Sequence, residues 1–287
     1  MNDVQTRLYL PEQPFVSVLM TAYNREKYVA EAIESVLKSS YKNFELIIVD
    51  DRSSDNTLAV AKKYEQNDSR VRIYMNEKNL GDYPNRNQAA SYAKGKYLKY
   101  VDADDYIYPA GLELLIQMME KFPNAGWGLC SLEQYVKKPF PFELTPREAY
   151  EYNYFGPGLF HKAPLSSIIK REIFEESGGF SPIRMAGDFE MWHRLAQQHN
   201  VVLMPGGIVW YREHDAQEIN DYFKFVLSYE QIRAKYLKDE NCPLEKSLIK
   251  KIISTQRKKL TGQYFANLLR LNFNKSKINS QQLQLYK

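Results

Sequence analysis

Strand-like and helix-like segments alternate through the first half of this chain. Four short apolar runs have the length and composition of buried strands: residues 15–20, 44–49, 71–74 and 97–101. The segments between them carry apolar residues at helical spacing. This β-α-β-α-β-α-β order favours a mostly parallel sheet with right-handed crossovers. We therefore expect an α/β fold whose central sheet is flanked by helices.

Acidic residues follow two of these strand segments directly. Asp50 and Asp51 come after the second run, and residues 102–105 contain three aspartates after the fourth. In an open α/β sheet, ligands bind outside the carboxyl ends of the strands. Carboxylates gathered there would repel one another unless a cation joined them, and a hard divalent ion commonly brings phosphates with it. The first hypothesis is a metal-assisted enzyme that acts on a phosphate-bearing substrate.

The regular pattern loosens after residue 110. Residues 112–119 and a segment near 189–198 are expected to be helices, whereas the Pro-, Gly- and aromatic-rich stretch 136–164 is expected to be a substrate-shaping loop region. Charge also divides unevenly, because residues 215–287 hold 14 basic and 7 acidic side chains. We expect a body over residues 1–214 and a basic helical extension over residues 215–287.

Composition indicates a protein of the cytoplasm. The 287 residues include only two cysteines, so no disulfide framework is implied. The N-terminus lacks the basic and apolar regions of a signal peptide. No uninterrupted apolar run reaches the roughly 20 residues of a membrane span. No nucleic-acid partner is expected.

Two other kinds of fold also place carboxylates at strand ends. A dinucleotide-binding domain needs a glycine-rich turn after its first strand, and residues 21–24 contain no glycine. A receiver-type binding module is much shorter than this chain. A nucleotide-sugar transferase remains.

Nine short segments, in order along the chain, share a further pattern: residues 16–24, 45–55, 79–81, 86–89, 95–98, 102–105, 178–180, 187–192 and 211–214. Together they resemble the family 2 inverting glycosyltransferases, which have the A-type glycosyltransferase fold with a Rossmann-like sheet. The resemblance covers roughly residues 14–214. It implies transfer of a sugar from a nucleotide donor with inversion at the anomeric carbon.

The resemblance assigns one group of residues to the nucleotide. Thr21, Tyr23 and Asp51 would hold the nucleobase end, and a carboxylate acceptor at Asp51 would favour uridine. Asp102, the first residue of an Asp-x-Asp pair, would lie near the ribose. Arg86 would contact the diphosphate, with a local cap or ion pair as the alternative.

A second group would carry the chemistry. Asp104 would bind Mn²⁺ or Mg²⁺ at the diphosphate. Arg212 and His214 would lie in the segment that closes on the diphosphate, with His214 as a second candidate metal ligand. Asp188 would be the general base.

One position departs from the family pattern. Many members have Glu-Asp where this chain has Gly187-Asp188. Asp188 could instead be only a helix N-cap. Glu190 is a nearby rival base, although residues two apart on a helix point in different directions.

The expected function is metal-dependent transfer of one sugar, from a UDP-sugar, to a saccharide or lipid-linked acceptor in cell-surface polysaccharide synthesis. The processive members' Gln-x-x-Arg-Trp motif and membrane helices are absent from this sequence. The alternatives are a nucleotidyltransferase and a non-catalytic protein that binds sugar nucleotides.

The C-terminal stretch 246–287 holds ten basic and no acidic residues. Apolar residues such as Ile249, Ile253 and Leu260 follow helical spacing there. Two interpretations remain open. These apolar residues pack on the body while the lysines face water, or residues 246–287 associate reversibly with anionic membranes.

Overall fold

The computed structural model describes residues 13–133, 137–214 and 222–286. Its centre is a sheet in the order β3-β2-β1-β4-β8-β6-β9-β7. The strands of this sheet are β1 (Val16–Ala22), β2 (Phe44–Asp50), β3 (Val71–Met75), β4 (Tyr97–Tyr100), β6 (Ala125–Leu132), β7 (Phe142–Leu144), β8 (Ser167–Lys170) and β9 (Asn200–Pro205). A separate two-stranded ribbon pairs β5 (Tyr106–Ile107) with β10 (Val209–Trp210).

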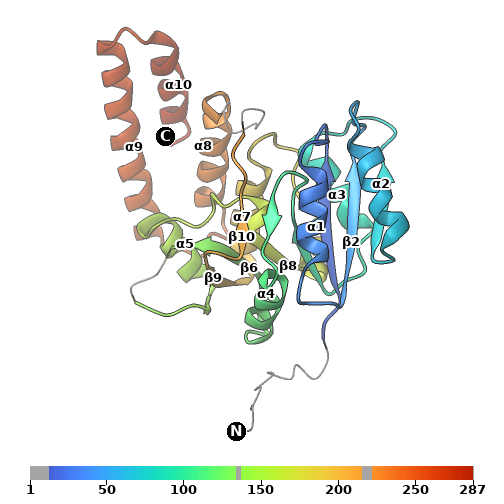
Figure 1. The fold of residues 1–287 in the computed structure, drawn as a ribbon. Coiled ribbons are helices and arrows are strands. Elements are labelled where there is room, and N and C mark those ends of the chain that lie inside the picture. The colour runs from blue at the N-terminus through green and yellow to red at the C-terminus, as the bar shows by residue number, and fades with distance from the viewer. Residues whose placement is uncertain (1–12, 134–136, 215–221, 287) are drawn as a thin grey trace.

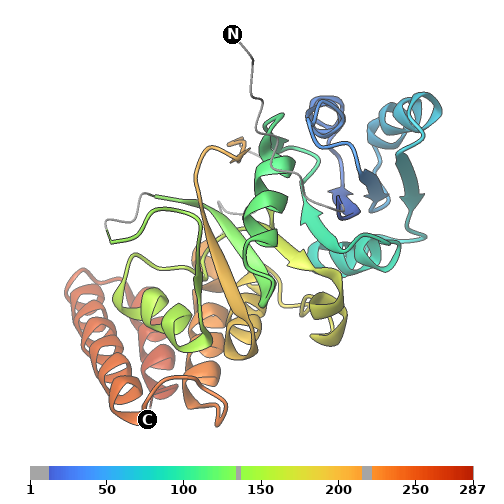
Figure 2. The ribbon, with the colours of Figure 1, turned by 90° about the horizontal axis from the view of Figure 1, so that it is seen from below.

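Helices cover both faces of the sheet (Figures 1 and 2). Their bounds are α1 (Val29–Leu37), α2 (Thr57–Asn67), α3 (Asp82–Ser91), α4 (Gly111–Glu120), α5 (Pro146–Phe155), α6 (Arg171–Glu176), α7 (Gly187–Gln198), α8 (Tyr222–Lys238), α9 (Lys246–Leu269) and α10 (Phe273–Gln284), with a 3-10 turn at Pro164–Ser166. The expected α/β class, with a mostly parallel sheet and helices on both sides, is confirmed.

The first four strands pair as the sequence pattern predicts. Strand β1 lies parallel to β2 and to β4, and β2 lies parallel to β3. Beyond β4 the sheet becomes mixed, because β8 runs antiparallel to both β4 and β6. The carboxyl ends of β1, β2 and β4 therefore meet at one edge of the sheet.

Alternate residues of β1 supply two apolar cores. Val18 and Met20 join a cluster with residues of α1 and α4, whereas Leu19 joins a cluster with residues of α3 and α7. This two-faced burial explains why the strand is apolar at nearly every position rather than at every second one.

The expectation of a loop over residues 136–164 is wrong in part. This stretch contains β7 and the ten-residue helix α5. The Thr145 hydroxyl accepts a hydrogen bond from Glu148 N–H, and the Glu148 side chain accepts one from Thr145 N–H, while Pro146 opens the helix. This reciprocal cap and the proline are a helix-start signal that the high Pro and Gly content obscured.

Residues 222–286 are mostly helical, as expected. Apolar side chains of α8 and α9, including Tyr236 and Leu260, belong to the same buried cluster as Trp192 of α7. Within α9, Ile252 is buried, and Ile249 and Ile253 pack against that cluster. The boundary at residue 215 stays a prediction and falls at residues outside the described part. No helix of the described residues has the length and apolar character needed to cross a membrane.

Candidate active site

Asp102 lies in the turn after β4, and two side chains hold its carboxylate in place. The Arg86 guanidinium donates to both of its carboxylate oxygens, at 2.7 and 2.9 Å, and the Thr21 hydroxyl donates to one of them at 3.2 Å. Arg86 also donates from Nε to Asp82 at 2.8 Å and lies over the Tyr100 ring. A bidentate, largely buried pair of this kind fixes a carboxylate strongly. In this structure Arg86 therefore orients Asp102. This contact is a local ion pair, which the sequence left open as the alternative to a contact between Arg86 and the diphosphate.

Asp104 lies two residues further on and meets two cationic or basic side chains. One of its oxygens accepts a hydrogen bond from Arg25 Nε at 2.7 Å and lies 3.0 Å from His214 Nε2. Burial acts to raise the pKa of Asp104, but the Arg25 charge and the His214 hydrogen bond bring that pKa below its ordinary value. Asp104 is therefore ionised at neutral pH and can serve as a ligand for a cation.

The ribbon of β5 and β10 brings the later segment to this turn. Trp210 pairs with Tyr106, so the chain after β10 runs back along residues 102–105. Arg212 donates from its backbone N–H to Asp105 and from Nε to the carbonyl of Asp104, at 3.0 and 2.8 Å. His214 is further held by stacking on Tyr28, with ring centroids 4.9 Å apart. The two predicted closing residues thus lie at the Asp-x-Asp turn.

The N-terminal half of α3 connects Asp102 with Asp188. Arg86 reaches Asp102 from this helix, and the hydroxyl of the neighbouring Tyr83 donates to Asp188 Oδ1 at 2.9 Å. Burial raises the pKa of Asp188 to about 6, although hydrogen bonds from Phe189 N–H and from Tyr83 act to lower it. A carboxyl that titrates near 6 is ionised at neutral pH and basic enough to take a proton from a hydroxyl during attack.

The two alternatives for Asp188 do not fit the geometry. Ala186 is the N-cap of α7, and the structure gives this cap no side-chain hydrogen bond. Glu190 is 3% exposed and is bound by Arg194, Ser181 and Tyr236. Glu190 thus ties α7 to α8, and its carboxylate is committed to that contact.

Asp51 lies at the end of β2 and is almost fully buried. Its carboxylate accepts hydrogen bonds from Asn76 Nδ2, Leu80 N–H and Gly81 N–H at 2.7 to 2.9 Å. Asp51 thus shapes the loop that leads into α3. The preceding Asp50 has a buried Oδ2 without a hydrogen-bond partner among the described residues. This second carboxylate, which received no role from the sequence, lies at the same strand end as Asp51.

Tyr23 follows β1 at the same edge and is 47% exposed. Its ring is open to stacking, while its carbonyl accepts a hydrogen bond from Arg25 Nη1. The structure thus brings Thr21, Asp102 and Arg86 into direct contact and Asp104 with His214. Asp51 and Tyr23 lie at neighbouring strand ends.

Three residues of the site were not predicted from the sequence. Arg25 and Tyr83 contact the two principal carboxylates, and Asp105 anchors Arg212. Burial and the nearby charge of Asp102 raise the pKa of Asp105. Asp105 stood within the acidic run, but nothing local to Arg25 or Tyr83 signals a contact with a residue 79 or 105 positions away.

Comparisons with known proteins identify the family of this chain. Glycosyl transferase family 2 matches residues 17–178. An uncharacterized glycosyltransferase of Haemophilus influenzae is 37% identical over 241 residues, covering 79% of this chain and 73% of the relative. The Escherichia coli protein "UDP-Glc:alpha-D-GlcNAc-diphosphoundecaprenol beta-1,3-glucosyltransferase WfgD" is 42% identical over 106 residues, which are 37% of this chain and 41% of that protein. Matches to three further relatives span 45%, 38% and 64% of their lengths.

Solved structures share the fold at low sequence identity. S. aureus TarS residues 1–349, in complex with UDP-GlcNAc, has a TM-score of 0.66 at 16% identity and covers 96% of this chain and 89% of that one. The mannosyltransferase PcManGT from Pyrobaculum calidifontis, in complex with GDP-Man and Mn²⁺, has a TM-score of 0.62 at 15% identity, with 96% and 86% coverage. The family match covers more than half of the chain, so this protein belongs to glycosyl transferase family 2.

Proposed function

We propose that this protein is a metal-dependent inverting glycosyltransferase that transfers a single sugar from a UDP-sugar to a saccharide or lipid-linked acceptor in cell-surface polysaccharide synthesis. One observation carries the proposal. The N-terminal half of α3 holds Asp102 through Arg86 and Asp188 through Tyr83, so a donor-side carboxylate and a base of raised pKa belong to one connected framework.

The chemistry needs a base on the acceptor side. As the acceptor oxygen attacks C1 of the donor sugar, its proton passes to the Asp188 carboxylate. The new O–C1 bond forms while the bond from C1 to the diphosphate oxygen breaks, and the electron pair leaves with the diphosphate. Attack opposite the leaving group inverts the anomeric centre in one displacement.

The Asp104 and His214 side chains suit a divalent ion. Their oxygen and nitrogen lie 3.0 Å apart, and both are ligand types that Mn²⁺ accepts. Within the described residues, no three His, Cys, Asp or Glu side chains gather as a metal site. Phosphate oxygens of the donor would supply further ligands to an ion held there, as is usual for Mg²⁺ and Mn²⁺ at nucleotide sites. An ion held there would neutralise charge that develops on the departing diphosphate.

The choice of donor and acceptor rests on chemistry and on relatives. A carboxylate at the nucleobase end can accept the N3–H of uracil, and TarS binds UDP-GlcNAc. The name of WfgD describes a glucosyltransferase that uses a UDP-sugar and a diphosphoundecaprenol-linked acceptor. These features support a UDP-sugar and a lipid-linked or saccharide acceptor here.

A panel of UDP-sugars with Mn²⁺ tests the proposal through slow release of UDP, and NMR of any product reports the anomeric configuration. Asp188→Asn should keep UDP binding and lose turnover by roughly two to four orders of magnitude. Glu176→Gln, an exposed carboxylate on α6, is the matched control.

Binding of UDP-sugars without any UDP release would favour the non-catalytic alternative. A product that retains the donor's anomeric configuration would contradict the single displacement. Near-normal turnover in Asp188→Asn would remove Asp188 as the base.

A further inference from the structure

The bend between α9 and α10 carries four large apolar side chains in water. Phe265 and Leu269 lie one turn apart on α9, Leu271 is in the bend, and Phe273 opens α10. They are 58%, 86%, 74% and 63% exposed. We call these four residues the hairpin tip. Exposed apolar side chains that gather at one place mark interaction surfaces more often than isolated ones do.

Packing of the hairpin does not account for the tip. The two helices contact each other through polar groups, with Asn267 donating to Asn279 at 2.9 Å. The buried positions Ile252 and Leu260 lie earlier on α9 and join the core of the body. Ile249, Ile253 and Leu260 of the apolar stripe that the sequence predicts are thus used for packing, whereas its last residue, Leu271, is exposed and belongs to the tip.

The bend places a leucine in a backbone conformation that leucine disfavours. Asn272 N–H bonds to the carbonyl of Asn267, and Leu271 N–H bonds to that of Leu268, which is a Schellman ending of a helix. The residue in the left-handed position of this ending is Leu271, with φ 54°. Glycine or asparagine is favoured there because a side chain with a Cβ is strained. A leucine at this position costs stability, and because it is 74% exposed it gains little from packing in return, which favours a role in contact with another molecule.

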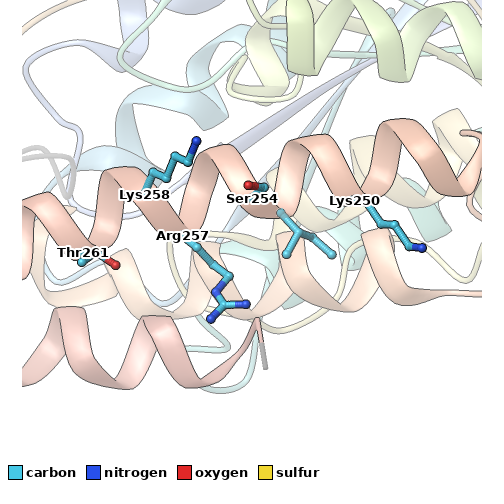
Figure 3. A pocket seen from close by; sticks show the side chains of 6 residues that line it. Lys250, Ser254, Arg257, Lys258 and Thr261 are labelled. Carbon is cyan, nitrogen blue, oxygen red and sulfur yellow. The ribbon is translucent and has the colours of Figure 1, made fainter.

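Positive charge runs along the hairpin below the tip, and Arg270 and Lys277 lie close to the tip itself. Every Lys and Arg among the described residues of 246–286 is exposed: Lys246, Lys250, Lys251, Arg257, Lys258, Lys259, Arg270, Lys275 and Lys277. No acidic residue occurs in 246–287. Lys250, Arg257 and Lys258 also line an open depression along α9 (Figure 3). An apolar tip on a cationic stem complements a surface that is anionic outside and apolar inside.

The tip lies at the same end of the molecule as the candidate site. Strands β1 and β2 rise toward the upper end of the view in Figure 1, and the α9–α10 bend is also at that end. A bilayer that touches the tip would therefore face the edge of the sheet at which Thr21, Asp51 and Asp102 are placed. An acceptor carried by lipid would meet the site from that side.

We propose that the hairpin tip docks this protein on anionic lipid bilayers. Phe265, Leu269, Leu271 and Phe273 enter the boundary between headgroups and acyl chains, and the basic residues nearest the tip, such as Arg270 and Lys277, contact lipid phosphates. The occupant is a lipid surface rather than an acidic protein, because leucine and phenylalanine at a convex tip can be buried by acyl chains without a shaped partner groove. The docking is independent of which sugar is transferred.

Flotation of the full chain with vesicles tests the proposal. We expect binding to phosphatidylglycerol-containing vesicles at low salt, weaker binding at high salt, and little binding to pure phosphatidylcholine vesicles. Leu269→Ser combined with Leu271→Asn should reduce the vesicle-bound fraction about tenfold, since two apolar side chains no longer enter the bilayer. Leu114→Ser, at an exposed leucine on α4 that is 40% exposed, is the matched control and should bind as the parent does.

The single variant Leu271→Asn separates docking from folding. Asparagine tolerates the left-handed conformation, so its melting temperature should be equal to or above that of the parent while vesicle binding falls. Three outcomes would overturn the proposal: no binding of the parent to anionic vesicles at low salt, unchanged binding of the tip variants, or a solution dimer that the tip variants dissolve while vesicle binding is absent. The last outcome would identify a second copy of this chain as the occupant.

Discussion

At the scale of single residues, the reactivity of the site depends on how much protein surrounds each carboxylate. Asp104 and Asp188 are both shielded from water, yet their pKa values move in opposite directions. Arg25 and His214 keep Asp104 ionised, whereas Asp188 has a phenol and a backbone N–H as its donors. The lowered pKa suits Asp104 for holding a cation, and the raised pKa suits Asp188 for accepting a proton.

The pH dependence of UDP release should report Asp188. A protonated carboxyl cannot accept the acceptor's proton, so kcat/KM should fall as pH decreases through about 6. Tyr83→Phe removes a hydrogen bond that lowers this pKa, and the acidic limb should move to higher pH. Rate profiles of the parent and Tyr83→Phe check this expectation. An acidic limb that stays in place, with only a lower plateau, would limit Tyr83 to packing.

Asp104 should govern the metal dependence of nucleotide binding. Asp104→Asn should lower Mn²⁺-dependent UDP affinity by roughly tenfold or more, because even partners outside the metal's own ligands are worth about 10–100-fold in metal affinity. Calorimetric titration with and without Mn²⁺ measures the difference, and Glu240→Gln at an exposed position serves as control. Equal affinities for the parent and Asp104→Asn would remove Asp104 from the metal site.

At the scale of elements, the start of α7 is fitted to the start of α3. A Cβ built on Gly187 would lie 2.6 Å from the carbonyl oxygen of Ser181 and 2.7 Å from the ring of Tyr83. The glycine at position 187 therefore leaves room for Tyr83, whose hydroxyl binds Asp188. The departure from the family pattern and the unpredicted tyrosine are two parts of one local arrangement.

Glycine-to-alanine changes can test this fit. Gly187→Ala should destabilise the protein by about 1–3 kcal/mol, because the Cβ must displace a carbonyl or a buried ring. Gly262→Ala on α9, where nothing lies within 4 Å of the added Cβ, should stabilise it by up to about 1 kcal/mol through helix propensity. Urea unfolding of both variants gives the two free energies. A neutral Gly187→Ala would mean that α3 and α7 move apart without cost.

At the scale of the whole molecule, the C-terminal helices share the core of the α/β body. Leu129 of the sheet, Tyr236 of α8 and Leu260 of α9 belong to one buried cluster, and the Tyr286 hydroxyl binds Glu230. If the C-terminal helices left this cluster, apolar surface would be exposed to water both on the helices and on the body.

Calorimetry should therefore show body and C-terminal helices unfolding together. We expect one transition whose calorimetric and van't Hoff enthalpies agree. Truncation after residue 245 should lower its midpoint, because Ile252 and Leu260 leave the cluster. Two separate transitions in the full chain would show that the predicted extension over residues 215–287 folds as its own unit.

The sequence by itself determined the features that depend on neighbours along the chain. Apolar runs predicted β1 to β4, and the acidic residues after β2 and β4 predicted where the site lies, because hydrophobic period and strand ends are local properties. The same local reading missed α5, although its capping pair was present. Only the tertiary structure decided that Arg25 reaches Asp104, that Tyr83 reaches Asp188 and that Glu190 turns away to Tyr236. It also decided that Ile252 and Leu260 are buried while Leu269 and Leu271 are exposed. These outcomes depend on which elements lie side by side, and a periodic pattern shows which face of an element is buried but not which distant segment covers it.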